Sequence, residues 1–333
     1  MIDTKVAISS RIRLARNISG FNFPCMIHGS EKEKAVSLKC EAVLRKLNNF
    51  KFFYMNELSE LERKSFVERY LISNYLANND GGVLAVCNDE LLSVMINEED
   101  HLREQCIVRG LDLFTAYKKT AALDSVLSAN IPFAQKNGVY FTACPSNLGT
   151  GLRASVMLFL PAITDSGRLQ EISDNAAQYG LTIRGRYGEG SFSESYLCQV
   201  SNEITYKISE QEILELVTGF VEDTISLELE LREEILNTNK DVIQDRVLRA
   251  LGLLKNCLMI SYSEFVELIC MVKLGLSMGF LTSNFDCGID DLLITASKAT
   301  LLMGNNSFGD TEDKMRAKFV GNALNSLNVC RKF

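Results

Sequence analysis

Polar and apolar residues alternate along residues 6–16 (VAISSRIRLAR), the pattern of a β-strand that buries one face. In such a strand one face carries Ile8, Ser10, Ile12 and Leu14, and the other carries Ser9, Arg11 and Arg13. Other strand-like segments are residues 51–55, a hairpin over 81–96 that turns at Asn88-Asp89-Glu90, and residues 139–144, 181–184 and 196–205. These short, separated strands predict a mostly antiparallel sheet.

Apolar residues spaced three and four apart predict helices between and after these strands. Two helices are expected to begin with a capping box, Ser30 with Glu33 and Ser59 with Glu62. The composition of residues 153–160 also favours a helix. Helical spacing then dominates residues 212–221, 227–235, 242–254 and 265–278. We predict an α+β domain over residues 1–225, with the sheet flanked by helices, and an all-helical C-terminal domain over residues 226–333.

Composition narrows the functional classes. The 333 residues include 35 Lys and Arg against 42 Asp and Glu, a net charge of −7, which argues against a nucleic-acid binder. His28 and His101 are the only histidines, so a site with several histidine ligands is excluded, and no metal site built by the protein is predicted. The ten cysteines form no CxxC pair and no apolar run is long enough to cross a membrane, so we expect a cytoplasmic protein with reduced thiols.

Several arginines lie at predicted strand ends and beside glycine-rich loops. Arg11 and Arg13 share a strand face, Arg153 follows the loop that contains Gly149 and Gly151, and Arg184 and Arg186 flank Gly185, while Arg103 follows an acidic run. Guanidinium groups bind phosphate oxygens in pairs, so these residues suggest a polyphosphate site. Each of them, taken alone, also fits a solvated or ion-paired surface arginine. The sequence contains no Walker A motif and no kinase-type glycine loop.

Carboxylates form the second candidate group. The run Asn97-Glu98-Glu99-Asp100-His101 places three acids at a strand end, and Glu189 lies in a glycine-rich loop. Two fixed carboxylates can hold a guanidinium group, orient its nitrogen and accept its proton. The alternative is an ordinary acidic turn. Cys144, just before Pro145, is either a reactive thiol near arginines or an inert buried cysteine.

Four stretches, read in order, resemble the catalytic domain of the phosphagen (guanidino) kinases, and most closely their bacterial branch, the McsB-type protein-arginine kinases. They are SSRIRLARN at 9–17, VMINEEDHLR at 94–103, TACPSNLGTGLRASVMLFLP at 142–161 and RGRYGEGS at 184–191. The strings NEEDHLR and CPxNxGTGxRAS are long and improbable by composition. The resemblance implies the guanidino-kinase fold, which is like that of glutamine synthetase, and the use of ATP with Mg²⁺.

Site residues follow from the resemblance position by position. It implies a catalytic pair, Glu99 and Glu189, that holds the acceptor guanidinium, with Cys144 as a supporting residue. The implied nucleotide-binding residues are Ser9, Ser10, Arg11, Ile12, Arg13, Tyr70, Arg103, Arg153, Ala154, Ser155, Val156, Met157, Arg184, Gly185, Arg186, Tyr187, Gly188 and Glu189. Tyr70 stands where the family usually has a histidine, and we expect this exchange to alter nucleotide affinity.

The order of the domains points to the protein-arginine kinases rather than to kinases of free guanidines. Only eight residues precede Ser9, where free-guanidine kinases carry a helical domain, and a helical region follows the catalytic part. In the resembling group these C-terminal helices support dimerisation and carry a phosphoarginine pocket with an RDxxRA motif. Here the motif becomes Glu312-Asp313-Lys314-Met315-Arg316-Ala317, which keeps Asp313 and Arg316 but puts an acid in place of the first arginine.

The sequence therefore predicts a kinase that phosphorylates arginine side chains of proteins, in stress response and in marking proteins for degradation. The resemblance implies a homodimer, protein substrates bearing arginine, and three partners: a zinc-binding activator, a heat-shock repressor and the Clp unfoldase–protease. Two other hypotheses stay open. One is a kinase of free arginine or another small guanidino compound, and the other is a catalytically weak adaptor, suggested by Tyr70 and Glu312.

Overall fold

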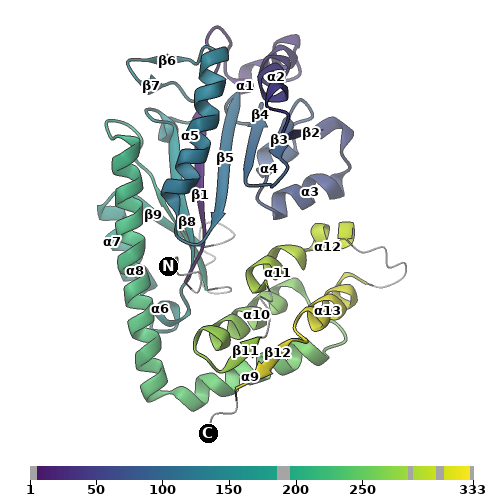
Figure 1. Cartoon of the computed structure of the whole chain (residues 1–333), viewed down its shortest axis with the longest axis vertical. Helices are drawn as coiled ribbons and strands as arrows, with labels where there is room; N and C mark the ends of the chain where they lie inside the picture. The colour runs from purple at the N-terminus through teal and green to yellow at the C-terminus, as the bar shows by residue number, and fades with distance from the viewer. Residues whose placement is uncertain (1–5, 186–195, 284–287, 305–310, 331–333) are drawn as a thin grey trace. The chain divides into compact units, whose positions relative to one another are not determined.

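The computed structural model describes residues 6–185, 196–283, 288–304 and 311–330 (Figure 1). Its strands are β1 Ala7–Arg16, β2 Phe50–Tyr54, β3 Val83–Cys87, β4 Leu92–Ile96, β5 Leu102–Arg109, β6 Gln135–Lys136, β7 Val139–Tyr140, β8 Leu152–Phe159, β9 Leu181–Gly185, β10 Leu197–Asn202, β11 Leu281–Ser283 and β12 Leu327–Val329. Its helices are α1 Pro24–Ile27, α2 Glu31–Leu44, α3 Glu60–Glu68, α4 Asn74–Ala77, α5 Leu113–Asn130, α6 Pro161–Asp165, α7 Leu169–Gln178, α8 Glu210–Thr238, α9 Lys240–Asn256, α10 Tyr262–Ser277, α11 Ile289–Thr295, α12 Lys298–Gly304 and α13 Glu312–Ala323.

The main sheet has eight strands in the order β2-β3-β4-β5-β1-β8-β10-β9. Strand β1 lies in its middle and pairs antiparallel with β5 on one side and β8 on the other. The predicted alternation along β1 is confirmed: Ser10, Ile12 and Leu14 are buried, whereas Ser9, Arg11 and Arg13 are only partly buried. The hairpin predicted over 81–96 is also confirmed, as β3 and β4.

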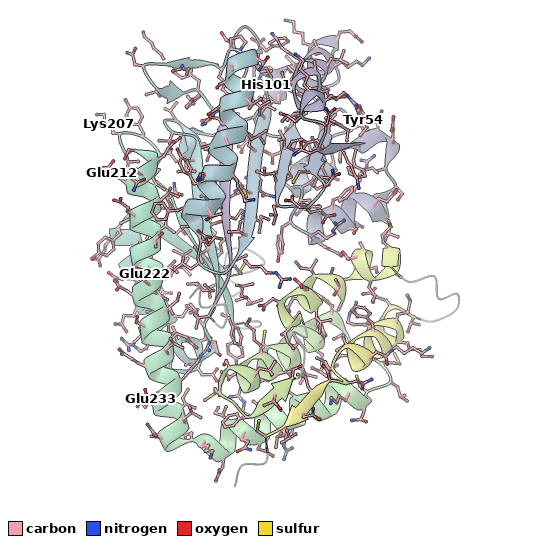
Figure 2. The ribbon with its side chains drawn as sticks, in the orientation of Figure 1. Tyr54, His101, Lys207, Glu212, Glu222 and Glu233 are labelled. Carbon is pink, nitrogen blue, oxygen red and sulfur yellow. The ribbon has the colours of Figure 1, made fainter. Side chains whose placement is uncertain are left out.

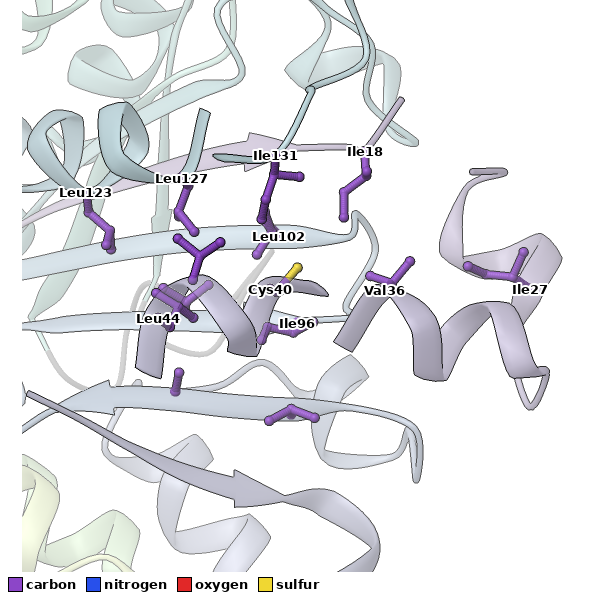
Figure 3. Packing of buried hydrophobic residues seen from close by; sticks show 14 residues of the cluster. Ile18, Ile27, Val36, Cys40, Leu44, Ile96, Leu102, Leu123, Leu127 and Ile131 are labelled. Atoms are coloured by element: carbon purple, nitrogen blue, oxygen red, sulfur yellow. The ribbon is translucent and has the colours of Figure 1, made fainter. Parts of the chain in front are cut away.

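One face of the sheet carries a hydrophobic cluster of fourteen buried residues, shown in Figure 3. Helices α2 and α5 cover this face, and Figure 1 shows α5 running along β1 and β5. Leu44 from α2 and Leu127 from α5 pack there against strand residues such as Ile96 and Leu102, and all four are fully buried. Burying a side chain of this size contributes about 1.5–3 kcal/mol, so this cluster fixes the helices on the sheet.

The opposite face is divided into an apolar part and a polar part. Over β2, β3 and β4 it is covered by the α3–α4 region, where Leu71 and Leu76 pack against Leu84 and Met95. Met95 pairs with Arg103 on the next strand, so the apolar part ends there. From β5 onward this face carries polar side chains, and the candidate site lies on it.

Residues 153–160 were predicted to form a helix, and this prediction is wrong. They belong to strand β8, which lies between β1 and β10 inside the sheet. The strand ends in the apolar residues Val156–Phe159, of which all but Met157 are fully buried. A short apolar run of this kind cannot be distinguished from a buried helix by its spacing alone. The strand predicted over 139–144 is likewise shorter, and covers only Val139–Tyr140.

The two predicted capping boxes have different outcomes. Ser59 and Glu62 form one at the start of α3. Ser30 is the N-cap of α2, but its side chain makes no capping hydrogen bond. The carboxylate of Glu33 is instead buried and accepts hydrogen bonds from the Gly29 N–H (2.7 Å) and the Asn79 side chain (3.1 Å). The Glu33 carboxylate is thus shared between a local partner, Gly29, and a distant one, Asn79, instead of accepting the Ser30 N–H.

The chain divides into two compact units. The first comprises Met1–Leu158, Ile172–Ile183 and Gln199–Asp223, and the second Phe159–Glu171, Arg184–Cys198 and Thr224–Phe333. In the second unit the carboxylate of Glu228 accepts the Ala162 and Ile163 N–H groups at the start of α6 and pairs with Arg232 at 2.7 Å. The domain boundary predicted between residues 225 and 226 stays a prediction.

Helices dominate the second unit, as the spacing after residue 209 predicts. The two helical segments predicted at 212–221 and 227–235 form one continuous helix, α8, along which Figure 2 labels Glu212, Glu222 and Glu233. The predicted α+β class, with a mostly antiparallel sheet and a helical C-terminal region, is confirmed. No helix in the described part of the chain is long and apolar enough to cross a membrane.

Candidate active site

Strand pairing places four arginines on one face of the sheet. Arg13 pairs with Arg153 across β1 and β8, and Arg103 pairs with Ala15 across β5 and β1. Paired residues of antiparallel strands project to the same side, and residues two apart in a strand do so as well. Arg11, Arg13, Arg103 and Arg153 therefore share the face opposite α5, and we call these four residues the arginine face.

These arginines crowd one another. Burial, followed by the charges of Arg103 and Arg153, lowers the pKa of Arg11 to about 10. Burial and the same neighbours, with Arg11 first among them, hold the pKa of Arg13 well below its usual value. The Nε atoms of Arg11 and Arg13 are buried and have no hydrogen-bond partner among the described residues. Buried, unpartnered N–H donors with excess positive charge fit a polyanion.

Not every predicted nucleotide-binding residue projects from this face. Ser9, Ser155 and Met157 share it by their pairing. Ser10, Ile12, Ala154 and Val156 have side chains on the other face and are fully buried. The Ser10 hydroxyl donates to the Gly110 carbonyl (2.8 Å) and accepts from the Asp112 N–H (2.9 Å), so it joins β1 to the start of α5. The side chains of this second set support the core.

Two polar side chains of β10 extend the arginine face. A guanidinium N–H of Arg153 donates to the Ser201 hydroxyl (3.1 Å), and the Gln199 amide donates to the Ser155 hydroxyl (2.8 Å). These contacts bring β10 into the site. No role for Ser201 and Gln199 could be predicted from the sequence, because their position depends on which strand lies beside β8.

Glu98 holds Arg103 in place. Its carboxylate is almost fully buried and accepts from Arg103 Nη1 (2.6 Å) and from the Ser73 hydroxyl (2.6 Å) through one oxygen. The other oxygen accepts the backbone N–H of Glu99 (2.8 Å). Glu98 belongs to the acidic run noted in the sequence, but no function was predicted for it.

Glu99 and Cys144 lie within hydrogen-bond reach of each other, and their assignment to the acceptor side of the site stays a prediction. Burial, with the neighbouring charges of Asp100 and Glu98, raises the pKa of Glu99, while Arg103 and a hydrogen bond from Cys144 lower it. The Cys144 thiol also lies 3.0 Å from the Ser146 hydroxyl. A carboxyl group whose pKa is raised is a better proton acceptor than an ordinary one.

Asp100 joins the segment that carries Cys144 to the end of β1. One of its carboxylate oxygens accepts the Ala143 N–H (2.7 Å) and the amide of Asn17 (2.5 Å). The Asn17 amide also donates to the Phe141 carbonyl (3.0 Å). Asp100 and Asn17 are both buried, so they place Cys144 beside Glu99 without touching a reactant themselves. Asn17 and Asp100 both lie in stretches that resemble the guanidino kinases, and this is the only feature of the sequence that points to them.

His101, labelled in Figure 2, completes this anchor as a neutral ring. Its Nδ1 accepts the Ile18 N–H (3.0 Å), and its Nε2 lies 3.0 Å from the Asn22 carbonyl. The first contact requires an unprotonated Nδ1. Burial lowers the pKa of His101 to about 4, in agreement with that tautomer.

Tyr70 lies beside the arginine face in a strained backbone conformation. Its φ is +59°, which is uncommon for a bulky residue, and its carbonyl accepts from the Gln105 amide (2.8 Å). Gln105 pairs with Arg13, so the Tyr70 backbone is tied to a residue of the arginine face. Strain of this kind is often found at binding sites. The assignment of Tyr70 to the nucleotide site stays a prediction.

The last predicted phosphate-binding segment is described only in part. Arg184 is exposed and Gly185 is buried at the end of β9. Arg186, Tyr187, Gly188 and Glu189 lie outside the described residues. The predicted pair of Glu99 with Glu189 therefore stays a prediction.

The predicted phosphoarginine pocket holds a fully buried arginine. Arg316 donates to the Ala296 carbonyl (2.9 Å), the Ile260 carbonyl (3.0 Å) and Asp313 (2.8 Å), and it also pairs with Glu312. Glu312 in turn lies 3.0 Å from Lys298. The guanidinium is surrounded by acceptors that neutralise it, in contrast to the arginine face.

Metal ligands are sparse in the described residues. Among them, no group of three or more His, Cys, Asp or Glu side chains lies close enough together to hold a metal ion. The described residues of the site can bind a polyanion at the arginine face, next to the partly buried Glu99 and the Cys144 thiol.

Comparison with protein families gives two matches along the chain. The ATP:guanido phosphotransferase C-terminal catalytic domain matches residues 31–231, and the protein-arginine kinase McsB C-terminal domain matches residues 240–332. The protein-arginine kinase of Clostridium tetani is 39% identical over 301 residues, which are 90% of this chain and 88% of the relative. That of Caldanaerobacter subterraneus subsp. tengcongensis is 36% identical over 331 residues, 97% and 98% of the two chains.

Solved structures share the fold. The substrate-free duplicated taurocyamine kinase of Schistosoma mansoni aligns with a TM-score of 0.62 at 21% identity, over 79% of this chain and 43% of that one. Lombricine kinase aligns with a TM-score of 0.59 at 22% identity, over 70% and 69%. The predicted guanidino-kinase fold is thereby confirmed.

Proposed function

The chain belongs to the guanidino phosphotransferase family, in its protein-arginine kinase branch, and on that premise we propose that it transfers the γ-phosphoryl group of ATP to arginine side chains of proteins. The observation that carries the proposal is the arginine face, where guanidinium groups lower one another's pKa next to a loop that presents Glu99. The negative charge of a triphosphate would offset the positive charges of the arginine face. The positive charge of an acceptor guanidinium would offset the negative charge of the Glu99 carboxylate.

In this proposal, ATP with Mg²⁺ supplies the phosphoryl group and neutralises part of its charge. Arg11, Arg13, Arg103 and Arg153 hold the phosphates and stabilise charge on the group in transfer. No metal ligand from the protein is predicted, so in this proposal Mg²⁺ is bound chiefly by the nucleotide. Ser9 and Ser155 share the arginine face, so we propose that they add hydrogen bonds to the nucleotide.

The acceptor side needs a proton acceptor, because a guanidinium has a pKa above about 12 and is not a nucleophile while protonated. In the transfer, a nitrogen–phosphorus bond forms as the bond from the γ-phosphorus to the β-phosphate oxygen breaks, and ADP leaves. The proton of the attacking nitrogen goes to a carboxylate, for which we propose Glu99 together with Glu189. Positioning and charge stabilisation account for most catalysis of this kind.

The acceptor is proposed to be a protein rather than a free guanidine because the curated relatives that match nearly the whole chain are protein-arginine kinases. The roles in stress response and protein degradation, the homodimer, and the partners named above (the zinc-binding activator, the heat-shock repressor and the Clp unfoldase–protease) stay part of the proposal. Binding of phosphoarginine at Asp313 and Arg316 stays a prediction as well. The occupied surroundings of Arg316 weigh against it.

The proposal is tested by incubating the protein with γ-labelled ATP, Mg²⁺ and an arginine-rich protein, and assaying acid-labile phosphoarginine by mass spectrometry. Parallel reactions contain free arginine or creatine in place of the protein. We expect phosphoarginine on the protein substrate, and its loss in Glu99→Gln. The control is Glu41→Gln, because Glu41 pairs with Arg45 at 2.8 Å but lies on α2, which covers the opposite face of the sheet.

Absence of phosphoarginine in the wild type would contradict the proposal and favour a binding adaptor. Faster ADP release with free arginine than with protein would favour the kinase of small guanidino compounds. Full activity of Glu99→Gln would remove the assigned role of Glu99.

A further inference from the structure

Glu98 is the one described side chain whose carboxylate hydrogen-bonds both the phosphate-binding and the acceptor-binding parts of the proposed site. One oxygen accepts from Arg103 Nη1 and from Ser73, both at 2.6 Å. The other accepts the backbone N–H of Glu99 at 2.8 Å. The Glu98 side chain is 3% exposed, so these contacts are largely shielded from solvent.

These contacts leave Arg103 able to bind a phosphate at the same time. A guanidinium carries five N–H donors, and the contact to Glu98 uses the Nη1 nitrogen. Arg103 is also close enough to Arg11 and Arg13 for its charge to lower their pKa. A phosphate that contacts the arginine face would therefore fix the Arg103 side chain and, through it, the Glu98 carboxylate.

The second oxygen of the Glu98 carboxylate connects Arg103 to the backbone of Glu99. An N–H hydrogen bond to a carboxylate restricts the backbone of the residue that donates it, here the residue whose side chain is proposed to hold the acceptor guanidinium. The Glu98 charge also contributes to raising the pKa of Glu99, after burial and Asp100. Ordering of the Glu98 carboxylate would thus order the Glu99 backbone.

We propose that Glu98 is a positioning residue that couples the two halves of the site, so that nucleotide bound at Arg103 prepares Glu99 to bind the acceptor. The inference rests on the proposed function for the identity of the two ligands. By thermodynamic linkage, the acceptor must then strengthen nucleotide binding by the same factor. Hydrogen-bonded networks in buried surroundings couple their members more strongly than exposed ones do.

A purely structural role for Glu98 makes a different prediction. A buried ion pair that only stabilises the fold would, on loss of one partner, loosen the arginine face and weaken nucleotide binding whether or not an acceptor is present. If Glu98 couples the two ligands, replacing it leaves the affinity for nucleotide in the absence of acceptor unchanged or higher, because removing the Glu98 charge frees Arg103 for the phosphate. The ratio of the nucleotide Kd without acceptor to the nucleotide Kd with acceptor distinguishes these roles.

The experiment measures the Kd of a non-hydrolysable ATP analogue with Mg²⁺ by calorimetry, without and with a saturating arginine-containing peptide. For the full-length wild type we expect the peptide to tighten nucleotide binding by about fivefold or more, the lower end of common coupling factors. In Glu98→Gln the factor should fall to about one, while nucleotide alone binds with an affinity at least equal to that of the wild type. Glu41→Gln, the buried and arginine-paired control, should keep the wild-type factor.

Three results would overturn the inference: a wild-type factor of one, an unchanged factor in Glu98→Gln, or equal weakening of nucleotide binding with and without peptide. If Glu98→Gln does not fold, the same ratio is measured in Glu98→Asp, which keeps the charge but is too short to contact both Arg103 and Glu99. A coupling factor that is lost in the variant supports the inference even if the wild type forms no phosphoarginine. That combination would contradict the proposed function alone.

Discussion

Arg316 in the helical unit is fully buried and Arg13 on the arginine face is partly buried, and the two are surrounded differently. Arg316 meets two backbone carbonyls and two carboxylates, which together neutralise its charge. Arg13 meets three other arginines, and burial together with their charge holds its pKa well below the usual value. The acids show the same contrast. The pKa of Glu99 is raised, whereas hydrogen bonds from Arg316 and Lys298 outweigh burial and lower the pKa of Glu312.

This difference separates structural charges from functional ones. A buried charge that is fully paired contributes to the fold and has little left to offer a ligand. A buried charge among like charges costs stability, and such an arrangement is typical of binding and catalytic sites. The following predictions test whether the two regions differ in this way, beginning with the largest effect.

Arg316→Met should lower the free energy of unfolding by about 3–5 kcal/mol, because it leaves buried carbonyls and acids without their partner. Urea denaturation followed by circular dichroism measures this change. The exposed pair formed by Arg249 and Asp245 offers the control Arg249→Met, which should be nearly neutral. A neutral effect of Arg316→Met would remove the structural role of this arginine.

Arg153→Ala should lower kcat about 10²–10³-fold, because it removes a charge that stabilises the phosphoryl group in transfer. The melting temperature should change little. Ser201→Ala removes only the hydroxyl contact to Arg153 and should have a much smaller effect on kcat. Activity of Arg153→Ala close to that of the wild type would show that the phosphates bind elsewhere.

His101 should make stability depend on pH below neutrality. Its pKa is about 4 in the folded chain against 6.5 as an ordinary value, so between these values only the unfolded chain takes up a proton. The free energy of unfolding should therefore fall as the pH drops from about 6.5 to 4, by up to about 3 kcal/mol. His101→Gln should flatten this part of the curve in denaturation experiments across the same pH range. An identical slope in both proteins would contradict the buried neutral ring.

Arg13→Met should do the opposite of Arg316→Met. We expect the free energy of unfolding to rise by about 1 kcal/mol, because a desolvated and repelled charge is replaced by an apolar side chain. Nucleotide binding, measured by calorimetry, should be lost at the same time. Loss of stability in Arg13→Met would mean that the arginine face is paired in the way that Arg316 is.

Cys144→Ser should have the smallest effect, a reduction of kcat by a few fold at most, because a hydroxyl can still donate to Glu99 and direct transfer forms no bond to sulfur. Cys144→Ala removes the donor that lowers the pKa of Glu99. The acidic limb of its pH–rate profile should therefore move to higher pH. A profile that does not move in Cys144→Ala would place the thiol away from Glu99 in solution.

The sequence by itself determined the family, the α+β class and the composition of the arginine face. Alternation along residues 6–16 placed Arg11 and Arg13 on one side of a strand. The motifs around Glu99 and Arg153 are long enough to identify the family. Local periodicity and long motifs are carried by neighbouring residues, so they can be read without a fold.

Only the tertiary structure decided which residues face the site and which support it. Residues 153–159 form a strand because β1 and β10 lie on either side of them, and the Glu33 carboxylate is held partly by Asn79, a residue distant in the sequence. Glu98 and Asp100 stand beside Glu99 in one acidic run, but their partners are distant in sequence: Ser73, Asn17 and Ala143. A hydrogen bond or a shared sheet face depends on distances in space, and the order of residues along a chain does not contain them.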